Sequence, residues 1–294
     1  MVTQPARTSP SQPGGATPVE ADPLINATGS DRFTLEQLLS VLDVRGDVPP
    51  VPVRALHSAH GGVLGGQQVG QQIVLAERVT PGKVVHSLNA IFFRPGNCRW
   101  PVWIDVERLA DGRSVGALAL SVRQDSQTLS RTNLMLRTRR PDPGIHRTST
   151  PLPVSPEAAE ADRHLRLIPW ETRLATEGPG YRRDHWSRIP GAGDDPTIWR
   201  ALLAHACEFM PAADVLAMAG LLTPTGEMLP GVTGLVLSMT VTFHDEVDVR
   251  EWLLYRVSGL HIADERAASR IEVFTAAGEL RAEASVISLL RQSR

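Results

Sequence analysis

Residues 64–93 read LGGQQVGQQIVLAERVTPGKVVHSLNAIFF, a Gly- and Gln-rich stretch followed by a run of Val, Leu, Ile and Phe. The first part predicts a helix over residues 65–76, and the second predicts a strand over residues 84–93. Three further extended segments, separated by turns, follow through Met135. One long helix followed by antiparallel strands predicts an α+β unit whose helix covers one face of its sheet.

The second half of the chain repeats this order of elements. A helix is predicted to begin near Pro196, because proline suits the first turn of a helix, where its missing N–H is not needed. Extended segments follow from Gly234 to Leu290. The leading strands of the two halves end at Phe93 and Phe243, 150 residues apart (243 − 93). The sequence therefore predicts an internal duplication of one small fold.

Composition divides the chain at two places. Residues 1–32 are rich in Pro, Gly, Ser and Thr and poor in large apolar side chains, so they are predicted to be a disordered tail. Residues 139–165 begin with a polar run that contains five prolines and are predicted to be a linker. The N-terminal unit is then expected over residues 33–138 and the C-terminal unit over residues 166–294.

The charge pattern excludes an electrostatic nucleic-acid binder. The 294 residues include 30 basic and 32 acidic side chains, and Lys83 is the single lysine. The basic residues form no long run, and only 5% of residues are aromatic, so stacking platforms for bases are scarce. No nucleic-acid partner is expected.

The apolar runs and the cysteines limit which other classes of protein this chain could belong to. No uninterrupted apolar run approaches the roughly 18 residues of a membrane span, and the N-terminus lacks the apolar region of a signal peptide. A cytoplasmic protein without a membrane partner is therefore expected. The two cysteines, Cys98 and Cys207, fit neither a zinc motif nor a disulfide framework, so structural thiols are expected and no metal site is predicted.

Several motifs resemble one family in both halves of the chain. The motifs are LGGQQVGQ at 64–71, VHSLNAIFFRPG at 85–96, DVERLADGRS at 105–114, WSR at 186–188, AHACEF at 204–209, MTVTFH at 239–244 and EWLLY at 251–255. Together with Gln124 they resemble acyl-CoA thioesterase II, the TesB-like double-hotdog proteins. The resemblance covers about residues 34–292 apart from the linker. It implies an α+β double hotdog, two tandem units that each wrap an antiparallel sheet around a long helix, and a homo-oligomer.

The resemblance also implies a chemistry, the hydrolysis of acyl-CoA or acyl-carrier thioesters without a metal or cofactor. In the family, three side chains of the second hotdog activate water: an Asp on the central helix, a Thr or Ser on the following strand and a Gln on the last strand. Carried over residue by residue, these positions hold Glu208, Val236 and Val286 here. One of the three polar functions is kept, with an extra methylene.

Neighbouring hydroxyls are the candidate replacements for the two lost polar groups. Ser238 and Thr240 are predicted to share a strand face with Val236, since alternate residues of a strand face the same side. Ser288 stands in the same relation to Val286. Each replacement shifts the polar group by about 6.6 Å per residue pair. The candidate catalytic residues are Glu208, Ser238, Thr240 and Ser288.

The first half offers a second polar set. By the 150-residue repeat, His86 takes the strand position equivalent to Val236. The candidate substrate-binding residues are His86, Gln67, Gln124, Gly65 and Gly66. By the resemblance, the glycines suit close helix-to-sheet approach and a backbone contact with pantetheine or with the thioester carbonyl. A structural role is the alternative for His86 and Gln67.

Other nearby side chains suggest weaker alternatives. His205 and Glu208, three residues apart, share a helix face and suit either a proton-transfer pair or an ion pair, whereas Cys207 and His205 do not face each other.

Three functions remain open at this stage. Thioester hydrolysis rests on the motifs. A double hotdog that has lost hydrolysis and binds acyl groups, or performs another reaction on a bound substrate, is favoured by Val236 and Val286. A protein-interaction module would rest on the Pro-rich tail alone.

Overall fold

The computed structural model describes residues 33–46, 48–56, 58, 61–140, 153–162, 167–178, 182–223 and 228–292. The tail predicted over residues 1–32 lies outside these ranges, as do residues 141–152 and 163–165 of the predicted linker.

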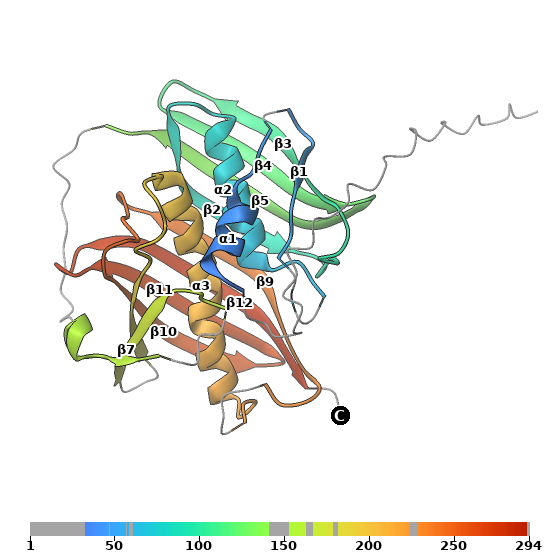
Figure 1. The fold of residues 1–294 in the computed structure, drawn as a ribbon. Helices are drawn as coiled ribbons and strands as arrows, with labels where there is room; N and C mark the ends of the chain where they lie inside the picture. Colours follow the sequence, from blue (N-terminus) through green and yellow to red (C-terminus); the bar gives the residue numbers. More distant parts are fainter. Residues whose placement is uncertain are drawn as a thin grey trace, which may run out of the picture.

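In the described part of the chain, twelve strands form one antiparallel sheet, and the helices lie on one of its faces (Figure 1). The strands are β1 (Val51–Val53), β2 (Lys83–Phe92), β3 (Val102–Asp111), β4 (Val115–Gln124), β5 (Gln127–Thr138), β6 (Glu160–Ala161), β7 (Glu171–Gly178), β8 (Arg182–Arg188), β9 (Val232–Phe243), β10 (Leu253–Ala263), β11 (Arg266–Thr275) and β12 (Leu280–Gln292). The helices are α1 (Leu35–Leu42), α2 (Gly65–Arg78), α3 (Pro196–Met218) and the 3-10 turn η1 (Pro156–Ala158).

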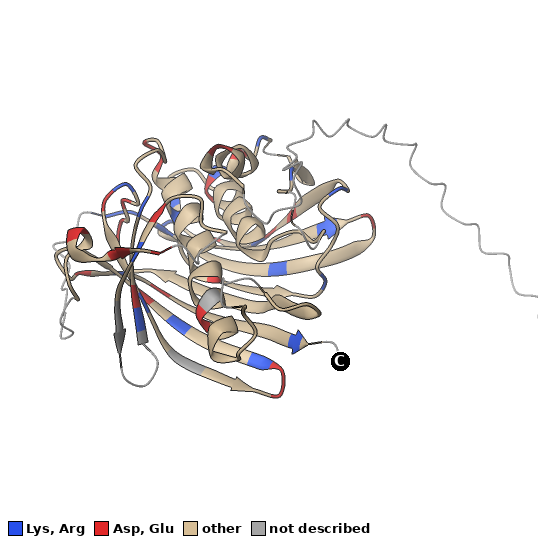
Figure 2. Ribbon diagram, turned by 60° about the horizontal axis from the view of Figure 1, so that its bottom comes forward, with Lys and Arg blue, Asp and Glu red and all other residues tan. Residues whose placement is uncertain are grey.

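The sheet order shows the duplication directly. Its order is β1-β3-β4-β5-β2-β9-β12-β11-β10-β8-β7-β6. Along the chain, the first unit consists of β1, α2, β2, β3, β4 and β5, and the second consists of β8, α3, β9, β10, β11 and β12. Outward from the β2–β9 junction, the strands of the first unit follow the order β2, β5, β4, β3, β1, and those of the second follow the equivalent order β9, β12, β11, β10, β8. The sheet curves around the two long helices, which carry few charged side chains (Figure 2). The predicted α+β double hotdog is confirmed.

The stretch predicted as a linker contains ordered structure. Within it, η1 and β6 form, and β6 pairs with β7 at the edge of the sheet. Asp162, directly after β6, lies 3.1 Å from Nδ1 of the buried His185 on β8. His185 Nε2 lies 3.5 Å from Asp214 of α3. Buried polar contacts therefore tie this segment to the second unit, which sequence composition alone does not indicate.

Helix α3 is apolar enough in length and hydropathy to match a membrane span, the one such helix in the described residues. The sequence of this helix contains no uninterrupted apolar run, because Arg200, Glu208 and Asp214 interrupt its apolar residues. For this reason the sequence alone did not indicate a membrane span here. In the structure, 71% of its most apolar stretch is buried, and it packs against α2 and the sheet. Its apolar residues therefore serve the core.

Gly70 of α2 lies where this helix contacts both α1 and α3. A Cβ on Gly70 of α2 would lie 2.7 Å from Leu42 Cδ2 of α1 and 3.5 Å from Ala201 Cβ of α3. Glycine at this position therefore lets three helices meet over the centre of the sheet.

Candidate active site

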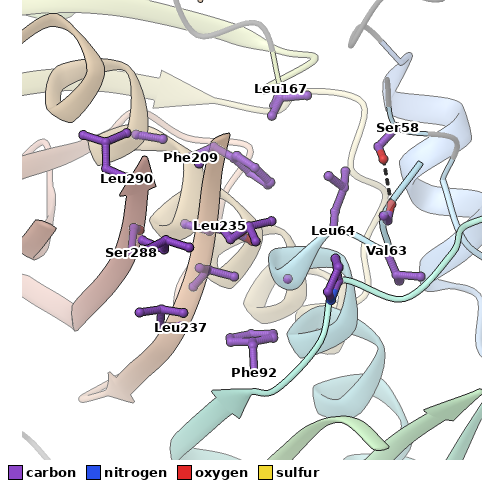
Figure 3. Close-up of a pocket in the computed structure, with 18 of the residues that line it drawn as sticks. Ser58, Val63, Leu64, Phe92, Leu167, Phe209, Leu235, Leu237, Ser288 and Leu290 are labelled. Carbon is purple, nitrogen blue, oxygen red and sulfur yellow. Dashed lines mark hydrogen bonds between the residues drawn. The ribbon is translucent and has the colours of Figure 1, made fainter. Parts of the chain in front are cut away.

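A cavity of about 500 Å³ lies between the first turn of α2, the middle of α3, the start of β9 and the end of β12. Figure 3 shows Phe209, Leu235, Leu237 and Leu290 on one side of it and Leu64 on the other. The lining is mainly apolar. Among the described residues the polar side chains in the lining are Ser58, Gln68, Arg94, Glu208 and Ser288. A mainly apolar cavity with a few convergent polar groups is the usual form of a small-molecule site.

Two of these polar groups are held by other parts of the protein. The Ser58 hydroxyl donates to the Gly62 carbonyl (2.7 Å). Gln68 donates through Nε2 to the Val63 carbonyl (3.0 Å) and accepts the Ser130 hydroxyl (2.7 Å). Glu208, Ser288 and Arg94 are then the groups available to a ligand.

Glu208 is the ionisable group at the centre of the cavity wall. Its Oε2 accepts a hydrogen bond from the backbone N–H of Gly66, at the first turn of α2. Burial raises the pKa of the Glu208 carboxyl to about 8, although the Gly66 N–H opposes this shift by favouring the charged form. A carboxyl with a pKa near neutrality is suited to take and return a proton at physiological pH.

The glycines predicted to bind substrate lie beside Glu208, and Gly65 lines the cavity whereas Gly66 does not. A Cβ on Gly66 would lie 2.8 Å from Glu208 Oε2 and 3.0 Å from the Cα of His205, and one on Gly65 would overlap Val236. Leu64, the N-cap of α2, gives the helix no side-chain cap. The Gly66 N–H is bound to Glu208, so the first turn of α2 presents the Gly65 N–H and the positive end of a helix dipole to the cavity.

A β-bulge decides which hydroxyls face this cavity. Ile287 of β12 pairs with Ser238, but the next residue, Ser288, pairs with Val236, so Leu237 is an extra residue in β9. A bulge reverses the alternation of faces along a strand. Ser288 and Val236 therefore lie together on the helix side of the sheet, and both line the cavity.

The prediction that Ser238 and Thr240 share a face with Val236 is wrong for the same reason. Their neighbour Met239 is buried under the helices, so Ser238 and Thr240 point to the other face of the sheet. There Thr240 accepts a hydrogen bond from Asn89 Nδ2 (3.0 Å). Neither lines the cavity.

The side chains predicted from the first half serve the fold. His86 is itself the extra residue of a bulge in β2, because Val85 and Ser87 pair with consecutive residues of β5. It is therefore equivalent to Leu237, one position away from the predicted match, and its Nδ1 donates to the Phe243 carbonyl (2.9 Å). This contact joins the two units but lies outside the cavity lining.

Both predicted glutamines bind backbone. Gln67 accepts the Leu56 N–H (2.8 Å) and donates to the Arg54 carbonyl (3.0 Å). Gln124 holds the turn before β3 through the N–H and carbonyl of Asn97 (2.8 and 2.6 Å). Neither belongs to the cavity, whereas Gln68, one residue from Gln67, does. The repeated Gln residues of α2 gave no signal to separate these roles.

The predicted alternatives near Glu208 are also resolved by the fold. His205 Nε2 donates to the Leu167 carbonyl (3.1 Å), and burial lowers the pKa of its imidazole to about 4. Its ring packs against Phe33 and Phe209 rather than the cavity. Cys207 is a free, buried cysteine whose pKa is raised by burial. His205 is thus a neutral core residue, and Cys207 is not suited to nucleophilic chemistry.

The duplication places a second glutamate at the position equivalent to Glu208. Glu208 lies twelve residues after the start of α3, and it contacts Gly66, the second residue of α2. In the same way, Glu77 lies twelve residues after the start of α2, and it accepts a hydrogen bond from the hydroxyl of Thr197 (2.9 Å), the second residue of α3. The two carboxylates are therefore related by the pseudo-twofold axis that relates the units.

The two equivalent carboxylates differ in their counter-ion. Both oxygens of Glu77 bind the guanidinium of Arg200, at 2.5 and 2.7 Å, and the pair is almost fully buried. The residue of α2 equivalent to Arg200 is Val69, a fully buried core residue, so Glu208 has no cation at this position. The hollow beside Glu77 is polar, with Arg78, Lys83 and Arg139 in its wall among others. One copy of the site has become an ion pair, and the other has kept a carboxyl in an apolar cavity.

In the described part of the chain, fold and site together define a double-hotdog protein with an apolar cavity that contains a carboxyl of raised pKa. Family models for the N-terminal and C-terminal domains of acyl-CoA thioesterase match residues 53–137 and 138–285. The chain belongs to the acyl-CoA thioesterase family.

Individual relatives agree with this membership. Acyl-CoA thioesterase 2 of Haemophilus influenzae is 24% identical over 258 residues, which cover 79% of this chain and 88% of that protein. Among solved structures, a tesB protein of Mycobacterium avium subs paratuberculosis superimposes with a TM-score of 0.74 at 24% identity, covering 88% of this chain and 100% of that one. TesB2 of Mycobacterium marinum, an acyl-CoA thioesterase II, gives 0.73 at 23% identity, with 87% and 98% coverage. The structural likeness supports the fold, and the family membership supports thioester hydrolysis.

Proposed function

We propose that this chain hydrolyses acyl-CoA thioesters in the described cavity, with Glu208 as the general base. The observation that carries the proposal is that Glu208 alone of the two equivalent glutamates faces an apolar cavity without a counter-ion. An apolar cavity suits an acyl chain, and a carboxyl of raised pKa suits proton transfer from water.

The reaction needs two groups besides the base. The Glu208 carboxylate takes a proton from water as the water oxygen bonds to the thioester carbonyl carbon. The N–H of Gly65, at the first turn of α2, stabilises the resulting oxyanion together with the positive end of the helix dipole, while the Gly66 N–H holds the Glu208 carboxyl. The intermediate then expels the thiolate, which receives the proton from Glu208, leaving a carboxylic acid and a thiol. Ser288 also lines the cavity, and we assign its hydroxyl to orient the water.

CoA is the proposed carrier of the acyl group. Arg94 lies at the cavity wall and is exposed, and among the described residues no ion pair engages its guanidinium. An unpaired guanidinium suits a phosphate of the carrier.

A free-thiol assay with a panel of short to long acyl-CoAs tests the proposal. Turnover by the wild-type chain and its loss in Glu208→Gln are expected. Ser288→Ala is expected to be slower, and Ser238→Ala, the matched control on the neighbouring strand and opposite face, is expected to match the wild type. No turnover with any acyl-CoA would refute the proposal.

Acyl binding without hydrolysis is the second candidate function. Val236 lines the cavity and Val286 is buried in the core, both apolar where the resemblance assigns polar groups. Tight binding of acyl-CoA with no release of thiol would favour this function over hydrolysis.

Assembly and location stay predictions. Ile91 and Ile287 are 48% and 44% exposed, in one row with Ser238 on the sheet face away from the helices. A homo-oligomer that covers this face would be detected by light scattering of the purified protein. Cytoplasmic location is tested by fractionation.

A further inference from the structure

The second unit is longer than the first between its helix and its leading strand. Glu77 and His86 of the first unit are nine residues apart, whereas their equivalents Glu208 and Leu237 are 29 apart, a difference of twenty residues (237 − 208 against 86 − 77). The difference shows in the elements: α2 ends at Arg78 and is followed closely by β2, but α3 continues to Met218.

These extra residues build one wall of the apolar cavity. Ala212, Val215 and Leu216 of α3 line it, together with Leu222 and Met228 from the segment that follows. The equivalent hollow of the first unit has no such wall, and charged side chains border it instead. In the described residues, the apolar cavity therefore lies beside Glu208 and not beside Glu77, because the second unit has the longer connection between its helix and its leading strand.

The lining residues follow one stripe of α3 that begins at the base. Glu208, Ala212, Val215 and Leu216 have the spacing i, i+4, i+7 and i+8, which places them along one face of a helix. At 1.5 Å per residue, Val215 lies about 10 Å along the helix from Glu208, and Ala212 about 6 Å. An extended alkyl chain advances roughly 1.3 Å per carbon, given C–C bonds of about 1.5 Å. About eight carbons therefore reach from Glu208 to Val215, and about four or five reach Ala212.

We propose that the extra segment of the second unit measures the acyl chain, and that Ala212 is the residue that lets chains longer than about five carbons enter. This inference rests on the proposed function, because it assumes that the thioester carbonyl lies beside Glu208. Ala212 is the smallest side chain of the stripe, so a larger one would fill the path that the chain follows.

Binding of non-hydrolysable alkyl-CoA thioethers tests the inference separately from hydrolysis. Calorimetric titration with butyl-, hexyl- and octyl-CoA should show affinity rising about fourfold per methylene, or roughly 250-fold from butyl to octyl. In Ala212→Phe this gain should shrink to less than about tenfold, with butyl-CoA binding nearly as in the wild type. Ala217→Phe is the matched control, since Ala217 lies on the same helix but is exposed and outside the cavity.

The outcomes separate the two proposals. Equal profiles for Ala212→Phe and Ala217→Phe, or no chain-length dependence in the wild type, would overturn the inference. The expected binding profile with no hydrolysis of the matching acyl-CoA thioesters would leave the inference standing and refute the proposed activity. Butyl-CoA binding and the unfolding transition of Ala212→Phe show that the variant is folded.

Discussion

Replacing Glu208 with Gln should change how the stability of the protein depends on pH. Burial raises the pKa of this carboxyl to about 8 from an ordinary value of 4.5. At 1.36 kcal/mol per pH unit, the difference between the two pKa values corresponds to roughly 5 kcal/mol in favour of the protonated carboxyl in the folded state. Glutamine has a similar shape and no titrating proton.

The sign follows from proton binding in the two states. Below pH 4.5 the carboxyl is protonated both folded and unfolded, so it adds no pH dependence. Between pH 4.5 and 8 the folded protein keeps the proton and the unfolded chain has lost it, so the free energy of unfolding falls as pH rises. The fall amounts to at most about 5 kcal/mol and ends near pH 8, where the folded protein also releases the proton.

Urea denaturation at a series of pH values measures this effect. Other titrating groups are common to both proteins, so the difference in unfolding free energy between Glu208→Gln and wild type isolates the Glu208 proton. We expect that difference to grow in favour of the variant between about pH 5 and 8. Glu107→Gln, at an exposed ion pair with Arg131, is the control and should show little change. A constant difference for Glu208→Gln over this range would refute the raised pKa.

Hydrolytic activity should depend on the same proton of Glu208, but it should rise with pH where the stability falls. As a base, Glu208 must be ionised, so kcat/KM for acyl-CoA should rise about tenfold per pH unit below pH 8 and level off above it. The variant should lose this dependence together with most of its activity. Full activity of Glu208→Gln would show that the base lies elsewhere.

Three further substitutions test the rest of the site. Ser288→Ala should lower kcat by about 100-fold while Ser238→Ala leaves it unchanged, measured by steady-state kinetics; equal effects would contradict the bulge-based assignment of faces. Arg200→Ala should lower the free energy of unfolding by about 3–5 kcal/mol, because it leaves the Glu77 carboxylate buried without its partner; a loss below about 1 kcal/mol in urea denaturation would contradict this. Arg94→Ala should raise KM for acyl-CoA about fivefold and leave KM for acyl-pantetheine, which has no phosphate, unchanged; equal changes for the two substrates would argue against a phosphate contact.

The sequence was informative where a residue's role depends on its near neighbours in the chain. Helical and strand periodicity marked α2, α3 and their following strands within a few residues, because the side-chain patterns repeat at 3.6 and 2 residues. The short strands β7 and β8 and the edge strand β6 were missed, since their stability comes from pairing with distant strands rather than from local pattern. The motif resemblance identified Gly65, Gly66 and Glu208, which the structure brings together.

The tertiary structure decided which side chains face the cavity and which charged groups form ion pairs. One extra residue at Leu237 turns Ser238 to the far side of the sheet and leaves Ser288 at the cavity. Such a bulge depends on the register between β9 and β12, which two other strands separate in the sequence. Likewise, two glutamates at equivalent positions look alike in sequence. Only the packing of α2 on α3 shows that Arg200 neutralises Glu77, while the buried Glu208 faces an apolar cavity and holds its proton.

The sequence by itself thus determined a duplicated α+β fold and the family to which it belongs, because both are written in local patterns and contiguous motifs. The tertiary structure decided which copy of the site has retained a carboxyl suited to catalysis, because burial, counter-ions and strand register are set by residues far apart in the chain.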